Sequence, residues 1–291
     1  MKLVAFSHNG IVGVGTLGDG YISGRLISDP HFPGEIDDWL REGDVKWRSK
    51  AALSSAPTFA LDSIEFRPPL TTPNKIICVG LNYREHTQES GYQQPEYPTL
   101  FTRFTTSLVG HLAPIVRPRV SAALDFEGEL VAVIGRGGRH IVPADALAHV
   151  AGYSVFNDGS IRDYQHRTPQ WTVGKNFDST GAFGPVFVTA DELPAGARGL
   201  SLQTRLNGEL VQSSNTDRMI FDVVTLVSIT SEAMTLLPGD LIVTGTPAGV
   251  GHSRNPKLYM KPGDVVEVEI EGIGILRNSI VDETLIAREV V

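Results

Sequence analysis

The sequence predicts an α+β protein that is mostly β, and three observations lead to that class. Short apolar segments of strand length recur along the chain, with turn residues between them. Only one segment shows a convincing helical period, with Ile220, Val223, Val224 and Val227 spaced at i, i+3, i+4 and i+7. Strands and helices do not alternate regularly, so a repeating βαβ architecture is excluded.

The first seventy residues predict a small N-terminal domain. Asn9-Gly10 separates two apolar segments, which is a strong hairpin signal. A short helix is expected over 35–40, ending near Gly43. The proline-rich stretch 67–73 then reads as a linker. We therefore expect one domain over residues 1–71 and a larger one over 72–291.

The larger domain is predicted to be built mainly from strands. Asn207-Gly208 predicts another hairpin, and the single clear helix is expected to be capped by Asn215, Thr216 or Asp217 and to end at Pro238-Gly239. The expected strands cover 75–80, 129–135, 152–156, 185–189, 202–206, 240–244 and 265–270.

Composition narrows the classes of partner and location. The chain has 291 residues, 41% of them hydrophobic, which is ample for a large core. A net charge of −8 argues against nucleic acid and anionic membrane as partners. The single cysteine, Cys78, lies in an apolar run and excludes both an intrachain disulfide and a multi-cysteine zinc site. With no apolar transmembrane run or signal peptide visible, we expect a cytoplasmic protein.

The strongest functional signal is a set of three acidic positions. Glu127 and Glu129 are two apart at the head of a predicted strand, so their side chains share a face. Beyond Glu129 the strand is wholly apolar, which indicates burial on both faces. Asp158 follows the next strand. Buried carboxylates need a cation or proton to compensate them, and oxygen ligands favour Mg²⁺ or Mn²⁺.

The same chain shows why this spacing alone proves little. Glu267, Glu269 and Glu271 repeat it, but there apolar and acidic residues alternate cleanly. That alternation predicts a half-exposed strand with solvated carboxylates. A solvated or salt-bridged pair therefore remains the alternative at 127 and 129.

A glycine-rich segment and a histidine–glutamate pair give weaker signals. Residues 13–18 match the dinucleotide fingerprint, but a turn and strand follow where a helix is required, so the glycines are assigned to hairpin turns. His86 and Glu89 stand at i and i+3 on an expected helical turn. A carboxylate beside an imidazole suits a general base, although a surface pair is the common alternative.

Four more residues could carry chemistry. Lys175 could stabilise an enolate oxygen or could be a snorkelling surface lysine. Arg162 and Gln165 could hold a substrate carboxylate or carbonyl, or Arg162 could pair with Asp163. Thr246 lies in a glycine-rich loop whose amides suit an anion, or which is simply a tight turn. No role is assigned to seven histidines: His8, His31, His111, His140, His149, His166 and His252.

Taken together, these segments resemble the fumarylacetoacetate hydrolase family from about residue 75 to 281. Five motifs occur in the family's order, and it is this order that is specific. They are Gly80-Leu81-Asn82-Tyr83 with His86 and Glu89, Asp125-Phe126-Glu127-Gly128-Glu129-Leu130, Asn157-Asp158 with Arg162-Asp163 and Gln165, Gly174-Lys175 with Phe177-Asp178, and the loop 244–251.

The resemblance implies a mixed β-roll with a small N-terminal domain, usually in a homodimer. It implies Mg²⁺ or Mn²⁺ bound at Glu127, Glu129 and Asp158. The chain departs from the family where Gly159 and Ile161 replace the usual valine and alanine. Arg103 stands where lysine is common, which keeps the charge but changes the hydrogen-bond geometry.

The function expected from this resemblance is metal-dependent C–C bond hydrolysis of a 2,4-dioxo acid, an acylpyruvate such as fumarylpyruvate or maleylpyruvate. His86, oriented by Glu89, would activate water. Lys175 would stabilise the enolate, while Arg162, Gln165 and Thr246 would bind the substrate. The alternative is an oxaloacetate decarboxylase or a 2-oxo acid tautomerase or isomerase using the same enolate chemistry. A non-catalytic metal-binding protein is a further alternative.

Overall fold

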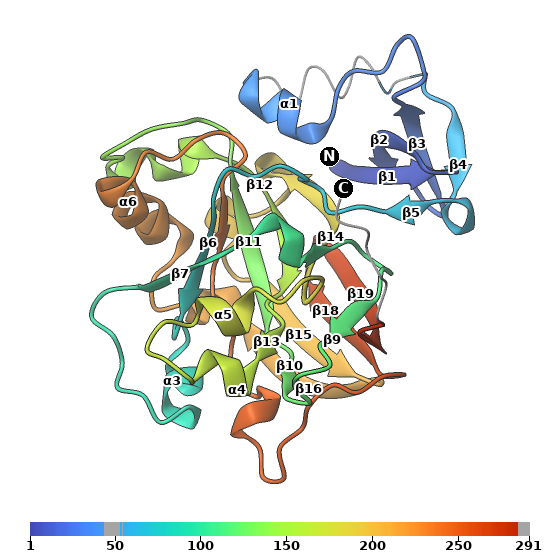
Figure 1. Cartoon of the computed structure of the whole chain (residues 1–291). Coiled ribbons are helices and arrows are strands. Elements are labelled where there is room, and N and C mark those ends of the chain that lie inside the picture. Colours follow the sequence, from blue (N-terminus) through green and yellow to red (C-terminus); the bar gives the residue numbers. More distant parts are fainter. Residues whose placement is uncertain (44–52, 54, 285–291) are drawn as a thin grey trace, which may run out of the picture.

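The computed structural model describes residues 1–43, 53 and 55–284, so both predicted domains extend beyond the described residues. It confirms a mostly β, α+β fold with mixed sheets (Figure 1). Within the described part, no helix is long and apolar enough to cross a membrane.

The N-terminal segment forms the predicted hairpin and short helix. Asn9 and Gly10 both adopt positive φ at the turn between β1 and β2. The elements of this segment are β1 Lys2–His8, β2 Ile11–Leu17, β3 Tyr21–Leu26, α1 Ile36–Arg41, β4 Thr58–Ala60 and β5 Glu65–Phe66. The glycine-rich match lies on β2, and no helix starts there, as the sequence led us to expect.

These strands continue the large sheet of the molecule. β1 pairs antiparallel with β14 at Lys2↔Val188 and Leu3↔Phe187. The division at residues 71 and 72 therefore stays a prediction.

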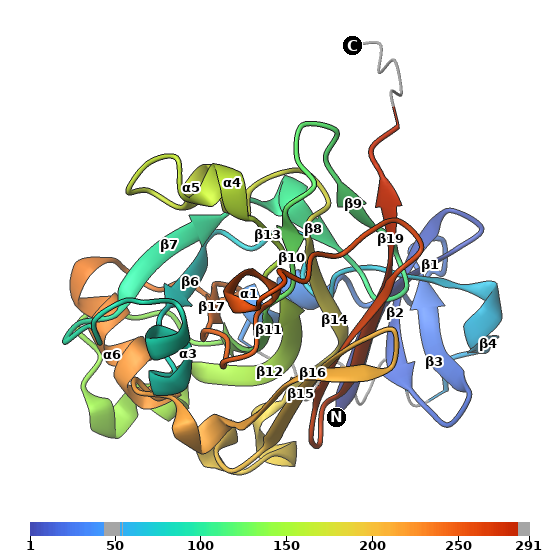
Figure 2. The same ribbon diagram turned by 90° about the horizontal axis from the view of Figure 1, so that it is seen from below.

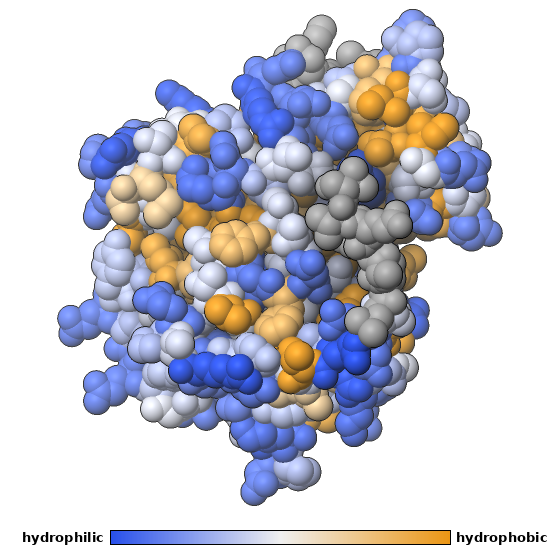
Figure 3. Space-filling model, in the orientation of Figure 1, coloured by the Kyte–Doolittle hydropathy of each residue, from blue (hydrophilic) through white to orange (hydrophobic). Residues whose placement is uncertain are grey.

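Apolar side chains gather over the N-terminal strands (Figure 3), and the exposed ones there include Ile11 and Tyr21. The expected homodimer also stays a prediction.

Most of the remaining chain consists of strands, as predicted. The large sheet runs β4-β3-β2-β1-β14-β12-β11-β17-β6-β7, a second sheet runs β16-β15-β18-β19-β9, and β10 pairs with β13. The strands are β6 Ile76–Gly80, β7 Thr99–Arg103, β8 Leu108–Val109, β9 Ile115–Arg117, β10 Leu124–Asp125, β11 Gly128–Ile134, β12 Val150–Asn157, β13 Ser160–Ile161, β14 Gly181–Thr189, β15 Ser201–Leu206, β16 Glu209–Asn215, β17 Leu241–Val243, β18 Val265–Ile270 and β19 Gly274–Asp282.

Four α-helices accompany these strands in the described residues, and three of them are short. They are α3 Arg84–Glu89, α4 Arg162–Gln165, α5 Thr172–Lys175 and α6 Val223–Ala233. Figure 1 places α3, α4 and α5 around the lower end of the central strands, and Figure 2 shows the same region from below. Two strands, β11 and β12, carry the acidic positions to this end.

The predicted start and end of the long helix were wrong. Asp222 caps it by accepting the Thr225 N–H at 2.9 Å, and Asn215 caps only a single 3₁₀ turn. The residues between do not continue the helix, because Ile220 and Phe221 donate their N–H groups at 2.8 Å to the carbonyl and the Oδ1 of Asn82. The helix ends at Ala233, before Pro238. Long-range contacts therefore override the local capping signal.

Candidate metal centre

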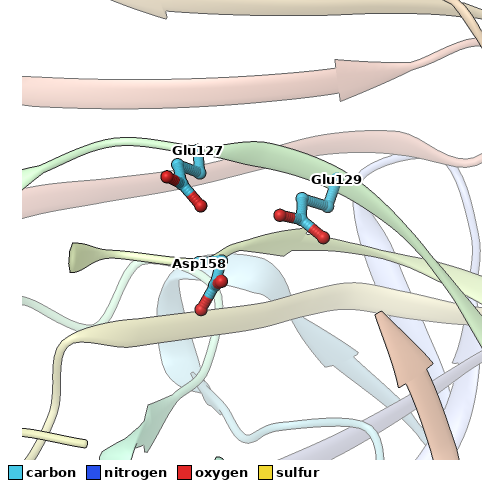
Figure 4. Close-up of side chains that lie close together, drawn as sticks. All are labelled: Glu127, Glu129 and Asp158. Carbon is cyan, nitrogen blue, oxygen red and sulfur yellow. The ribbon is translucent and has the colours of Figure 1, made fainter. Parts of the chain in front are cut away.

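The three acidic positions meet where β11 and β12 pair. Gly128 is opposite Asn157 in this antiparallel register, so Glu127 and Glu129 flank a position next to Asp158. One carboxylate oxygen from each lies within 4.8 Å of the others, and all three side chains are buried. Figure 4 shows Glu127 and Glu129 leaving the same strand on the side that faces Asp158. The pleat thus brings the predicted ligands together.

Two of the three carboxylates are already paired with buried cations. The Lys175 ammonium lies 2.6 Å from Glu127 Oε2 and 2.6 Å from Asp158 Oδ2. Arg162 Nη2 lies 2.6 Å from Glu127 Oε1. Burial alone would raise the pKa of Glu127, but Arg162 and Lys175 hold this pKa below its usual range. Lys175 is thus a buried partner of the acidic cluster rather than a snorkelling surface lysine.

Glu129 is the exception among the three. It accepts the Gly245 N–H at 2.5 Å. Burial, followed by the charges of Asp158 and Glu127, raises its pKa well above the ordinary value. Such a buried carboxyl is stabilised in its ionised form by a nearby cation. Because the donor atoms are all carboxylate oxygens, the residues fit a hard divalent cation such as Mg²⁺ or Mn²⁺.

Two of the departures from the family pattern, Arg103 and Gly159, have structural reasons here. Arg103 is buried, and its Nη1 donates to Asp158 Oδ1 at 2.5 Å and to the Gly159 carbonyl at 3.0 Å. Its Nε donates to Ser107 and its Nη2 to Thr180. A lysine has a single side-chain nitrogen and could not make all of these contacts. At Gly159, a Cβ atom would lie 2.0 Å from the Thr180 carbonyl oxygen, so no side chain fits.

His86 and Glu89 form the predicted pair on α3. Nδ1 of His86 lies 2.9 Å from Glu89 Oε1. Glu89 also accepts the Gly249 N–H at 2.9 and 3.1 Å, so the 244–251 loop anchors the pair. With Nδ1 engaged by the carboxylate, Nε2 is the ring nitrogen left for proton transfer. His86 lines the same cavity as Glu127 and Glu129.

Arg162 and Gln165 are also brought to this cavity, but in different roles. Arg162 does not pair with Asp163; its Nε donates to Asp125 Oδ2 at 2.8 Å. Its Nη1 donates to Gln165 Oε1 at 2.8 Å. Because that amide oxygen is occupied, Gln165 has its NH₂ group available for a ligand. The guanidinium of Arg162 is thus engaged by protein groups, and it orients Gln165.

The 244–251 loop uses its amides differently from the anion-binding alternative. Three of its amides are used by the protein's own carboxylates: Gly245 N by Glu129, Gly249 N by Glu89 and Gly251 N by Asp125. The Thr246 hydroxyl accepts from Gln212 at 2.9 Å and donates to the Gly128 carbonyl at 3.1 Å. The loop therefore positions the acidic residues, and Thr246 lines the cavity.

The cavity also contains two histidines to which the sequence assigned no role. It has a volume of about 290 Å³, and His166 and His252 line it together with the predicted site residues. His166 follows Gln165 directly and His252 follows the glycine-rich loop, but neither shows a ligand-like spacing. Only the tertiary structure brings them together, with ring centroids 5.3 Å apart.

The fold and the site define a class: an α+β enzyme with a buried carboxylate cluster that fits a divalent cation. Residues 75–281 match the family described as fumarylacetoacetate (FAA) hydrolase, C-terminal. The human oxaloacetate tautomerase FAHD2A, mitochondrial, is 38% identical over 289 residues, covering 97% of this chain and 92% of the relative. The chain belongs to the fumarylacetoacetate hydrolase family.

Solved structures agree with this assignment. The fumarylacetoacetate hydrolase of Exiguobacterium antarcticum has a TM-score of 0.84 at 38% identity, covering 97% of this chain and all of that one. The maleylpyruvate hydrolase of Sphingobium sp. SYK-6, solved with manganese and pyruvate, has a TM-score of 0.78 at 27% identity, covering 98% and 100%. The family thus includes both tautomerases and hydrolases. The expected cytoplasmic location of this protein stays a prediction.

Proposed function

We propose that this protein is a metal-dependent keto–enol tautomerase of a small 2-oxo diacid of the oxaloacetate type. The observation that carries the proposal is the likeness to oxaloacetate tautomerases over nearly the full chain, 38% identical across 289 residues. This replaces C–C hydrolysis, our first expectation, with the alternative that uses the same enolate chemistry.

The size of the cavity supports a compact substrate. Its volume of about 290 Å³ is at the lower limit of ligand pockets, which are roughly 300–1,000 Å³. A four-carbon oxo acid needs little space, whereas an acylpyruvate with a long acyl chain needs more.

The residues of the chain provide what tautomerisation requires. His86 Nε2 would take the proton from C3 of the keto acid, with Glu89 holding the ring. The C–H electrons then form the C2–C3 double bond, the C2=O2 π electrons move to O2, and O2 would take a proton back from the His86 imidazolium to give the enol. The Gln165 amide and the Lys175 ammonium would stabilise negative charge on O2. A bound dication would supply Lewis-acid polarisation of the 2-oxo group.

C–C hydrolysis remains the second candidate, favoured by the His86–Glu89 pair itself. A histidine oriented by a carboxylate at 2.9 Å could equally deprotonate a water molecule. The two reactions differ in their products, because only hydrolysis breaks the carbon chain.

Proton NMR in D₂O would separate the two functions. The Mn²⁺-free, Mg²⁺-loaded protein is given oxaloacetate or acetylpyruvate, and both C3 exchange and product formation are followed. The proposal expects rapid C3 exchange of oxaloacetate without any pyruvate formed by the protein. His86→Gln should slow it by about 10²–10⁴-fold, while His31→Gln, on an exposed surface residue, should not. Pyruvate and acetate from acetylpyruvate would instead establish the hydrolase, and pyruvate with CO₂ from oxaloacetate a decarboxylase.

A further inference from the structure

We infer that His166 and His252, with Lys257 beside them, bind the second carboxylate of the substrate and make the site selective for dianionic 2-oxo acids. This inference rests on the proposed function of the same cavity and deepens it by assigning the specificity. The two histidines lie in the cavity wall with Arg162 and Gln165, and none of the predicted catalytic roles uses them.

The two imidazoles are held by a rigid frame. The backbone N–H groups of Gly251 and His252 donate to Asp125 at 2.8 Å each. The same carboxylate accepts from Arg162 Nε at 2.8 Å. His166 caps the helix that carries Arg162, donating its N–H to that residue's carbonyl at 3.2 Å. Asp125 and Arg162 therefore fix both segments relative to each other, and the rings meet at an interplanar angle of 34°.

Two groups contact the His252 ring. Lys257 Nζ lies 3.0 Å from Nδ1 and 3.2 Å from Nε2, and the Tyr259 hydroxyl lies 2.8 Å from Nδ1. An ammonium group has no lone pair, so the ring nitrogen that bonds to Lys257 accepts. The other nitrogen of the neutral ring carries the proton.

The local electrostatic field favours an anion at this place. Burial, followed by the positive charges of Arg162 and Lys257, lowers the pKa of His252 to about 4. Burial, Arg162 and Lys257 also lower the pKa of His166. Asp125 and Glu127 act in the opposite direction on His252 and His166 respectively, but less strongly. The net field at the two rings is therefore positive.

These groups match the chemistry of a carboxylate. The two neutral imidazoles present N–H donors that a carboxylate can accept, and the Lys257 ammonium beside His252 adds positive charge. A substrate with a methyl group in this place would leave them unpaired, and sites built to hydrogen-bond a substrate group strongly reject analogues that lack it.

The experiment compares two four-carbon acids that differ only at the far end. Oxaloacetate ends in a carboxylate and 2-oxobutanoate ends in a methyl group. Calorimetry measures the affinity of the Mn²⁺-loaded protein for each acid. We expect a strong preference for oxaloacetate, reduced at least about tenfold by His252→Leu or His166→Leu. His252→Gln, which keeps a donor, should restore part of the preference, and His31→Leu should leave it unchanged.

The outcomes are decisive. Equal weakening of both acids would show that the histidines are structural and would overturn the inference, as would an unchanged preference or none in the wild-type protein. If the leucine variants do not fold, Lys257→Met on the exposed lysine must lower the preference about threefold, and an unchanged preference overturns the inference. Because calorimetry reports binding and C3 exchange reports turnover, a preference that persists without C3 exchange would contradict the proposed function alone.

Discussion

The same Glu-x-Glu spacing occurs at two places in the molecule, with opposite consequences. Glu127 and Glu129 are 4% and 2% exposed at the start of β11. Glu267 and Glu269 on β18 have side chains 26% and 41% exposed. β11 lies between β12 and β17 and is buried along its whole length. β18 buries only alternate residues. The surroundings of the strand, and not the spacing, determine whether two carboxylates form a site.

The counter-charges differ in the same way. Around β11 the cations are buried, and Arg103, Arg162 and Lys175 each lie within 2.6 Å of a carboxylate oxygen. On β18 the partners are half exposed: Arg205 is 2.7 Å from Glu269 and Arg277 is 3.5 Å from Glu267. A buried pair is costly to break, whereas an exposed pair is screened by water.

The largest contrast is expected in activity. Glu129→Gln removes a charged oxygen ligand and should lower kcat/KM for oxaloacetate tautomerisation by about 10³-fold or more, since metal-ion catalysis contributes several kcal/mol. Glu269→Gln, with the same change of atoms on β18, should stay within about twofold. C3 exchange measured at saturating Mg²⁺ compares the two. Equal losses would show that the two strands do not differ as described.

A second contrast is expected in stability. Arg103→Met leaves the buried carboxylate of Asp158 without one of its two cations and should lower the free energy of unfolding by about 3–5 kcal/mol. Arg277→Met breaks an exposed pair and should cost about 0–1 kcal/mol. Urea denaturation of both variants measures the difference. A loss near zero for Arg103→Met would mean that Lys175 alone is sufficient for Asp158.

A bound metal ion should stabilise the folded protein only through the carboxylates at β11, and not through those on β18. At 100 times its dissociation constant, a cation that binds the folded state alone adds about 2.7 kcal/mol. Mn²⁺ should therefore raise the Tm of the wild-type protein and of Glu267→Gln, but not that of Glu129→Gln. Differential scanning calorimetry with and without Mn²⁺ tests this, and a Tm increase in Glu129→Gln would place the cation elsewhere.

The smallest expected effect is on the pH dependence of stability, and it comes from His252 in the cavity wall. Burial, Arg162 and Lys257 lower the pKa of His252 to about 4 from an ordinary value of 6.5. As pH falls, the unfolded chain takes up this proton first, so the contribution is fully present above pH 6.5 and is lost toward pH 4. Because the ring is partly exposed, we expect about 1 kcal/mol or less. His252→Gln should flatten the stability profile in that window, and an unchanged slope would contradict the assignment.

Much of the site could be predicted because its signals are local. Glu127 and Glu129 share a face by the strand period, and their buried strand is visible as an apolar run. His86 and Glu89 pair through an i, i+3 spacing on α3. The fold class followed from the recurrence of short apolar segments.

The rest depends on long-range contacts that no local pattern contains. Lys175 could not be recognised as buried, because its partners are 48 and 17 residues away. A pair of Arg162 with Asp163 was one of the alternatives, but its partners are Asp125 and Glu127. His166 and His252 are 86 positions apart and meet only in the folded chain. The start of α6 was misplaced for the same reason.

Titration of the metal-stripped protein with Mn²⁺ tests the central claim most directly, because it counts the cations that the two Glu-x-Glu segments hold. The account predicts one tight site in the wild-type protein, lost in Glu129→Gln and retained in a variant with both Glu267→Gln and Glu269→Gln. A tight site that survives Glu129→Gln, or one that disappears with the β18 substitutions, would contradict it.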